Sequence, residues 1–218
     1  MQRHILSRVE MRADNIKYFD SRQIARLRRI VRDKAWIAWS KRQPTAIREW
    51  LAIDLLTGTG MRVSEVVDLR CGDLHCGYGE CEIFVRNGKG GKSRTIQIQE
   101  SLKTHIRQYI GWKIERQEPI GEDDYLFIGQ RGPWTRQAVQ QMVKKYFKQM
   151  GIYEKGKSVH ALRHSYATEL YRNSKDLRAV QKQLGHASIT TTMVYADVSK
   201  EDIRDHLSGM WRNTNHTQ

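Results

Sequence analysis

The spacing of apolar residues constrains the fold most strongly, because it follows the period of an α-helix along most of the chain. The first such stretch begins at Asp20-Ser21, a pair typical of a helix start. Its apolar residues, three or four apart, are Ile24, Leu27, Val31 and Ala35. The same reasoning predicts further helices at Thr45 to the Gly58-Thr59-Gly60 turn, Arg62–Leu69, Ser101–Gln117, Thr135–Met150, Val159–Asn173, Leu177–Leu184, Ser188–Tyr195 and Lys200–Ser208.

One region follows the period of a β-strand instead. Apolar and polar residues alternate in Cys81–Arg86 and again in Ser93–Gln99, and the Gly-rich segment Asn87–Lys92 joins the two runs. Alternation on both sides of such a turn predicts an antiparallel hairpin. A further short strand is predicted at Tyr125–Ile128. The predicted fold class is therefore mainly α with a small antiparallel β-sheet (α+β).

Composition limits the partners of the chain. Its 218 residues, 39% of them hydrophobic, suffice for one domain with a proper core. Lys and Arg number 38 against 24 Asp and Glu, and a net charge of +14 favours an anionic partner such as nucleic acid. No run approaches the ~18 apolar residues of a membrane span, and the N-terminal residues do not form a secretory signal. We therefore expect no membrane partner and a cytoplasmic, nucleoid-associated protein, and the three cysteines fit a reduced compartment.

Several common catalytic motifs are missing from the sequence. It holds no Gly-x-x-x-x-Gly-Lys-Ser/Thr loop, no Gly-x-Ser-x-Gly elbow and no His-Glu-x-x-His pair. Asp123-Asp124 lacks a third acid for a two-metal nuclease site. The spacing of Cys71, His75, Cys76 and Cys81 is not that of a zinc knuckle, so small buried thiols are the better interpretation. We expect neither a metal ion nor another cofactor.

Two segments of the first half carry candidate phosphate-binding residues. Arg62 stands at a predicted helix start, and Glu65, three residues on, shares its face and is able to orient the guanidinium. An ordinary surface ion pair explains the same spacing. In Gly88-Lys89-Gly-Gly-Lys92-Ser-Arg94, lysines on a hairpin tip are placed to meet a phosphate or a leaving oxygen. Taken alone, that segment is a solvated turn.

Two segments of the second half add histidines, an arginine and a tyrosine. His160 and Arg163 lie three apart near a helix N-terminus, where they point the same way and the helix dipole favours an anion. We interpret the adjacent His164 as a packed or surface histidine. His186 follows a helix-ending glycine, and Tyr195 comes nine residues later. By itself Tyr195 would be a core tyrosine with its hydroxyl satisfied.

Together these residue types match phosphoryl transfer by an amino-acid nucleophile without a metal. Arginine forks neutralise the equatorial oxygens of a pentavalent phosphate. A phenol with a pKa of about 10 needs a base and a positive setting before it attacks. A lysine whose pKa is lowered by a cationic site is able to protonate the departing alkoxide.

The order of the motifs resembles the catalytic domain of the tyrosine recombinases, the phage integrase family. The resemblance covers about Tyr18 to Trp211. Its motifs are Thr-Gly-Met-Arg-Val-Ser-Glu, Gly-Lys-Gly-Gly-Lys, His-Ala-Leu-Arg-His, and Leu-Gly-His followed nine residues later by Tyr. The resemblance implies the fold of the DNA breaking-rejoining enzymes and a site-specific recombinase of the integrase or invertase type. Such an enzyme works through a 3′-phosphotyrosine intermediate, without metal or ATP.

The resemblance also implies a role for each candidate residue. Arg62 and Arg163 would clamp the scissile phosphate, with Glu65 supporting the clamp and His186 hydrogen-bonding a phosphate oxygen. Tyr195 would form the covalent link.

The proton-transfer residues follow from the same resemblance. His160 would be the base or proton shuttle. Lys89 would protonate the leaving 5′-hydroxyl, because the family's lysine follows the first glycine of this turn. Lys92 and Arg94 lie close enough in sequence to compete for that assignment.

We expect three parts in the chain. These are an N-terminal arm (1–18), the catalytic domain (19–198), and a C-terminal helix and tail (199–218) that docks either on its own domain or on a neighbouring protomer. The tail presents an apolar edge of Ile203, Leu207, Met210 and Trp211. Most family members carry a further N-terminal helical domain, whereas about twenty residues precede the first predicted helix here. The chain thus matches either an excised catalytic domain or a minimal member.

The partners implied are double-stranded DNA, further copies of the chain as a tetramer on DNA, a monomeric state in solution, and accessory DNA-bending proteins. Two alternatives stay open from the sequence. A type IB topoisomerase shares nearly the same chemistry but relaxes DNA as a monomer. A non-catalytic DNA-binding regulator would show salt-sensitive binding without cleavage.

Overall fold

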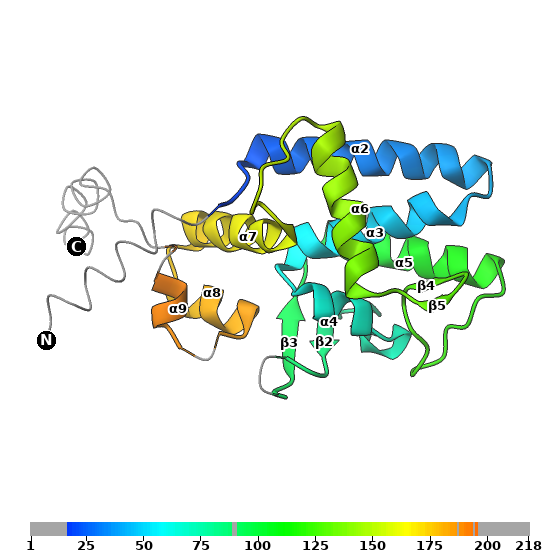
Figure 1. Cartoon of the computed structure of the whole chain (residues 1–218). Coiled ribbons are helices and arrows are strands. Elements are labelled where there is room, and N and C mark those ends of the chain that lie inside the picture. The colour runs from blue at the N-terminus through cyan, green and yellow to red at the C-terminus, as the bar shows by residue number, and fades with distance from the viewer. Residues whose placement is uncertain (1–16, 89–90, 187, 194, 196–218) are drawn as a thin grey trace, which may run out of the picture.

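The computed structural model describes residues 17–88, 91–186, 188–193 and 195 (Figure 1). Helices dominate this part of the chain, as predicted. They are α2 (Ser21–Ser40), α3 (Pro44–Thr59), α4 (Val63–Asp68), α5 (Glu100–Glu115), α6 (Arg136–Gln149), α7 (Val159–Ser174), α8 (Leu177–Leu184) and α9 (Thr190–Met193), with a 3-10 turn η1 at Cys71–Asp73. The predicted helix at 200–208, most of the predicted arm and the tail 199–218 lie outside the described residues.

Capping residues explain where the helices begin and end. Asp20 caps α2 with its side chain, and Thr135 caps α6 in the same way. Gly60 and Gly185 end α3 and α8 in the left-handed conformation, with φ of 65° and 66°. Helix boundaries could therefore be predicted closely. The exception is α9, which has four residues instead of the eight predicted at 188–195.

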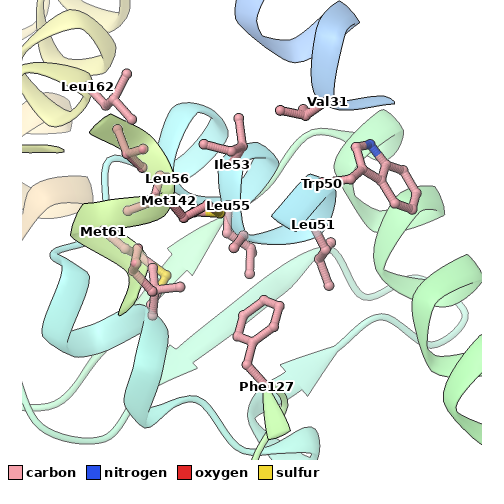
Figure 2. Close-up of a cluster of buried hydrophobic side chains, with 14 of the residues drawn as sticks. Val31, Trp50, Leu51, Ile53, Leu55, Leu56, Met61, Phe127, Met142 and Leu162 are labelled. Atoms are coloured by element: carbon pink, nitrogen blue, oxygen red, sulfur yellow. The ribbon is translucent and has the colours of Figure 1, made fainter. Parts of the chain in front are cut away.

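The hydrophobic core forms around α3, which is buried on nearly every side. This helix packs against α2, α5 and α7 (Figure 1). Figure 2 shows Leu51, Leu55 and Leu56 of α3 among side chains from other elements, including Phe127 and Leu162. Each buried leucine of this kind stabilises the fold by about 1.5–3 kcal/mol relative to an exposed one. The last turn of α3, which leads into the candidate site, is thereby held rigidly.

The predicted hairpin is present and belongs to a three-stranded antiparallel sheet. Its strands are β1 (Leu74–His75), β2 (Glu82–Val85) and β3 (Arg94–Gln97), in the order β1-β2-β3. The register pairs Val85 with Arg94 at the end nearer the Gly-rich turn. Strand β1 was not predicted, since two residues are too few to show alternation. Among the described strands, β3 has no neighbour on its second edge, and this edge faces α8.

The prediction of a strand at Tyr125–Ile128 is wrong in its extent. A second small sheet pairs β4 (Ile128–Gly129) with β5 (Gly132–Pro133), so only Ile128 belongs to a strand. Tyr125 forms an isolated bridge with Arg70, whose guanidinium carbon lies 3.3 Å from the centre of the tyrosine ring. Leu126 and Phe127 are fully buried in the core. Single backbone hydrogen bonds, such as that from the N–H of Leu126 to the carbonyl oxygen of Leu69 at 2.9 Å, hold this segment in place of a continuous strand.

The three cysteines, predicted to be small buried thiols, are free thiols that lie half-buried beside the core. Within the described ranges, no group of three or more His, Cys, Asp or Glu side chains is arranged to hold a metal ion. None of the helices in those ranges has the length and apolar character needed to cross a bilayer.

Candidate active site

Arg62 lies directly after the turn that ends α3 and caps the start of α4. Its Nη1 donates to Oε1 of Glu65 at 2.8 Å, and its backbone N–H donates to Oε2 at 2.7 Å. The predicted ion pair is therefore present, but it is not a surface pair, because the Glu65 side chain is 1% exposed. Burial alone would raise the pKa of Glu65, yet hydrogen bonds from Arg94 and Arg62 outweigh burial and hold the pKa below its ordinary value.

The Arg62 guanidinium keeps donors for a ligand. Its side chain is 21% exposed, and among the described residues only Glu65 accepts a hydrogen bond from it. A guanidinium carries five N–H donors in a planar fork that matches phosphate oxygens. Arg62 is thus anchored on one side and free to bind an anion on the other.

Arg163 comes from the first turns of α7 and is buried, with 7% exposure. Its Nη1 donates to the carbonyl oxygen of Gly60 at 2.6 Å, and its Nη2 donates to that of Leu184 at 2.8 Å. Burial and the nearby charge of Arg62 lower the pKa of Arg163 to about 10. The guanidinium therefore stays positive at neutral pH, and it ties the end of α3 to the end of α8.

His186 occupies the turn between α8 and α9, directly after Gly185. Its Nδ1 lies 3.0 Å from the hydroxyl oxygen of Thr192. Burial, together with the positive charges of Arg163 and Arg62, lowers the pKa of His186 to about 4. The imidazole is therefore neutral at pH 7, beside two arginines.

Tyr195 is buried at the same place, with 7% exposure. Its hydroxyl oxygen lies 2.7 Å from Nδ1 of His164, and its ring stacks on the ring of His186 at 6.4 Å between centroids. Burial raises the pKa of Tyr195 above its ordinary value, while the charge of Arg163 acts in the opposite direction. The phenol is protonated at neutral pH, and a base is needed before it can attack.

His164 is a packed histidine, one of the two options that the sequence left open, but its contacts also place it in the candidate site. The half-buried side chain contacts the hydroxyl of Tyr195, so His164 is part of the site. Burial and the charges of His160 and Arg163 lower its pKa, which favours the neutral ring that is able to accept a proton. One signal in the sequence could have found it. His164 follows His160 by four residues, and such a pair shares a helix face.

His160 and Arg163, which we expected to point the same way, differ in their exposure to solvent. His160 is exposed on the first turn of α7, whereas Arg163 is buried. The ring is nonetheless close enough to His164 to lower the pKa of that residue. His160 therefore stands at the solvent side of the site, one helical turn before His164.

Lys89 lies outside the described residues, so its assignment stays a prediction. The flanking turn is closed by a hydrogen bond from the N–H of Gly88 to the carbonyl oxygen of Lys92, at 2.9 Å. Lys92 is exposed. Arg94, by contrast, turns inward and is not a competitor for the lysine's place, since its side chain is 11% exposed and contacts Glu65.

Comparison with known proteins identifies the family. Residues 17–202 match the phage integrase family, and the chain belongs to that family. The tyrosine recombinase XerD of Halalkalibacterium halodurans is 39% identical over 166 residues, which make up 75% of this chain and 54% of that protein. XerD of Listeria innocua is 37% identical over 164 residues, or 74% of this chain and 54% of the relative. The chain thus spans about half the length of these curated relatives.

Solved structures agree with the family. The XerH site-specific recombinase bound to difH substrate in a pre-cleavage complex superposes with a TM-score of 0.72 at 28% identity, over 89% of this chain and 54% of that one. The XerA recombinase gives a TM-score of 0.67 at 29% identity, over 88% of this chain and 64% of that one. The predicted fold of the recombinase catalytic domain is confirmed.

Proposed function

We propose that this chain cleaves and rejoins DNA strands through Tyr195, as the catalytic part of a site-specific recombinase. One observation carries the proposal. The Tyr195 hydroxyl contacts His164, and the Tyr195 ring stacks on that of His186. The charges of Arg163 and Arg62 act on the same place, where burial and these charges lower the pKa of His186. The XerH structure, which belongs to a relative, contains a DNA substrate and supports the same assignment.

The proposed reaction exchanges one ester for another. The Tyr195 oxygen forms a bond to phosphorus while the bond from phosphorus to the 5′ oxygen breaks, which leaves a 3′-phosphotyrosine and a free 5′-hydroxyl. Arg62 and Arg163 bind the non-bridging oxygens, whose negative charge grows in the transition state. The covalent link conserves the energy of the phosphodiester. Attack by another 5′-hydroxyl therefore restores DNA without ATP.

His164 contacts the phenolic hydroxyl and is neutral, so it accepts the proton of Tyr195. His160, exposed one turn earlier on α7, exchanges that proton with solvent. His186 donates a hydrogen bond to a phosphate oxygen. Lys89, on the hairpin turn, supplies the proton that the 5′ oxygen takes up as it leaves.

We propose that copies of the chain assemble as a tetramer on double-stranded DNA at the nucleoid, with segment 199–218 of one copy docked on the next. A cavity of about 640 Å³ between α2, α7, α8 and β3 supports the docking. Its lining includes the partly exposed side chains of Ile24, Tyr166 and Leu170, and the sequence of the segment holds apolar residues suited to such a surface. Cross-linking on DNA checks this: Trp211→Ala weakens the tetramer, and an unchanged tetramer would argue against docking.

The covalent adduct tests the catalytic proposal directly. The 218-residue chain is mixed, in EDTA, with a library of labelled duplexes, each nicked beside a randomised core so that cleavage releases a short fragment. We expect the wild-type chain to form an adduct that survives denaturing gels. Tyr195→Phe should form none while binding the same DNA, because only the attacking oxygen is removed.

Exposed tyrosines supply the control. Tyr78→Phe changes an aromatic side chain that is fully exposed, and it should leave the adduct unchanged. An adduct with Tyr195→Phe, or the absence of any adduct with the wild-type chain, would refute the proposed function.

A further inference from the structure

The Glu65 carboxylate is shared by two arginines, and each gives it two hydrogen bonds. Oε1 accepts from Nη1 of Arg62 and from Nη1 of Arg94, both at 2.8 Å. Oε2 accepts from the backbone N–H of Arg62 at 2.7 Å and from Nη2 of Arg94 at 3.0 Å. Arg94 thus grips the carboxylate with a two-pronged fork, the geometry that restricts both partners most. The orientation of Glu65 depends on Arg94 as much as on Arg62.

Arg94 also contacts the end of α8. Its Nε donates to the carbonyl oxygen of Gln183 at 3.3 Å. Its aliphatic part packs on Gly185, where an added Cβ would come within 2.6 Å of the Arg94 Cδ. All three guanidinium nitrogens, Nε, Nη1 and Nη2, therefore donate to protein atoms, and the side chain is 11% exposed. Arg94 is committed to the protein and is not arranged to bind a phosphate itself.

A glutamine reinforces the same junction. Gln183 donates from Nε2 to the carbonyl oxygen of Gln97 at 2.6 Å, and it accepts from the Gln97 N–H at 3.3 Å. Its amide thereby pairs with both backbone groups of Gln97 at the edge of β3 away from β2, as a neighbouring strand would. The strand that follows the Gly-rich turn is thus fastened to the helix that precedes His186.

Charge gives Arg94 a second effect. Without Arg94, the single negative charge of Glu65 would be matched by Arg62 alone, and the pair would be close to neutral. With Arg94 present, two positive charges share one carboxylate, and one net positive charge is left at a site that is largely shielded from water. More of the Arg62 charge is then available to an incoming phosphate.

We propose that Arg94 is a positioning residue of the active site. It fixes Glu65, and through Glu65 it sets the orientation and the effective charge of the Arg62 guanidinium; it also joins β3 to the turn that carries His186. The inference rests on the proposed function, because Arg62 is taken to bind the scissile phosphate. Arg94 acts through Arg62 and does not touch the DNA.

The test measures single-turnover cleavage at saturating DNA, with the nicked duplex most abundant in the wild-type adduct. We expect Arg94→Gln to slow cleavage by about 10- to 100-fold, since a displacement of about 1 Å in a catalytic group costs up to ~100-fold. The affinity for DNA should change less than about twofold, because the lost effect belongs to the transition state. Arg94→Lys keeps the positive charge but loses the two-pronged contact, so its cleavage rate should fall between those of the wild type and Arg94→Gln.

A substrate with a neutral linkage separates positioning from general damage. A methylphosphonate at the scissile position has a methyl group in place of one charged oxygen, so a guanidinium contributes less to its cleavage. If Arg94 acts through Arg62, the deficit of Arg94→Gln shrinks at least about fivefold on this substrate. The deficits of Arg62→Gln and Arg94→Gln should also be less than additive when combined.

Arg86→Gln is the matched control. Arg86 follows β2 in the same sheet and is also paired with a carboxylate, Asp73, at 2.6 Å. The Arg86→Gln variant should cleave DNA at the wild-type rate. Wild-type cleavage by Arg94→Gln and Arg94→Lys, or an Arg94→Gln deficit equal on both linkages, would overturn the inference while leaving the proposed function intact. If Arg94→Gln does not fold, the same two comparisons are made with Arg94→Lys.

Discussion

Arg62 and Arg163 present guanidinium groups to the same site, but the protein holds them by different means. Arg62 is anchored by a buried carboxylate and keeps about a fifth of its side chain exposed. Arg163 is buried and is anchored by two backbone carbonyl oxygens. One anchor carries a full negative charge, and the other carries only dipoles.

The kind of anchor decides how much positive charge each guanidinium keeps and how firmly the group is placed. Carbonyl anchors do not neutralise the charge of Arg163, and burial together with the nearby charge of Arg62 lowers its pKa to about 10, although Glu65 acts in the opposite direction. The carboxylate anchor neutralises part of the Arg62 charge but places the group firmly at lower cost. We expect Arg163 to supply more of the electrostatic stabilisation, and Arg62 to be the residue whose contribution is adjusted by its neighbours.

Among tests of the two anchors, replacing each arginine by lysine should give the largest effect, measured as the cleavage rate. Arg163→Lys should reduce single-turnover cleavage by about 100- to 1000-fold, because a lysine cannot reach both carbonyls and a phosphate, and losing one oxyanion-site donor costs that much. Arg62→Lys should cost less, about 10- to 100-fold, since a lysine keeps a point charge beside Glu65. Equal losses in the two variants would show that the anchors do not matter.

Melting temperatures measured on the same two variants complete this test. Arg163→Lys leaves a buried carbonyl without its donor, which costs about 1–3 kcal/mol. Arg62→Lys should melt close to the wild type.

The pH dependence of the melting temperature should give a smaller effect, and it tests whether the Glu65 anchor of Arg62 is charged. The pKa of Glu65 is lowered in the folded state, so its ionised form stabilises the fold above the unfolded pKa, and this contribution is lost as the pH falls through the lowered value. Glu65→Gln does not titrate. The difference in melting temperature between wild type and Glu65→Gln should therefore be largest near pH 7 and should shrink below about pH 4.5. A difference that is constant down to pH 3.5 would contradict a charged anchor.

Arg163→Lys provides the contrast, because backbone carbonyls do not titrate. Its melting temperature should follow that of the wild type in parallel over the same pH range. A convergence of these two curves in acid would mean that the charge of Glu65, which raises the pKa of Arg163, supports the arginine more than the carbonyl oxygens do.

Local signals explain why most of the fold could be predicted from the sequence. Asp20 and Thr135 mark helix starts by their own side chains, and Gly60 and Gly185 mark helix ends by conformations that other residues adopt with strain. Strand β1 and the true extent of β4 had no such signal. They are two-residue pairings set by neighbours distant in the sequence, and a period cannot be read from two residues.

The candidate site could be predicted in part. The ion pair of Arg62 with Glu65 is local and followed from spacing. The contacts of His164 with Tyr195, and of Arg94 with Glu65, join residues 31 and 29 positions apart. They depend on how α7, β3 and the α8–α9 turn pack together, which no local pattern contains. In the sequence, Arg94 stands out only as a neighbour of the lysines.

The two carbonyl contacts of Arg163 have a practical consequence for anyone who wants an inert version of this protein. Because the side chain bridges Gly60 and Leu184, replacing it removes a scaffold tie together with a functional group. An inactive variant made at Arg163 would therefore also be less stable than the wild type. Tyr195→Phe deletes a single oxygen, whose hydrogen-bond partner in the described part of the chain is His164, so it is the better starting point for trapping an intact protein on its target.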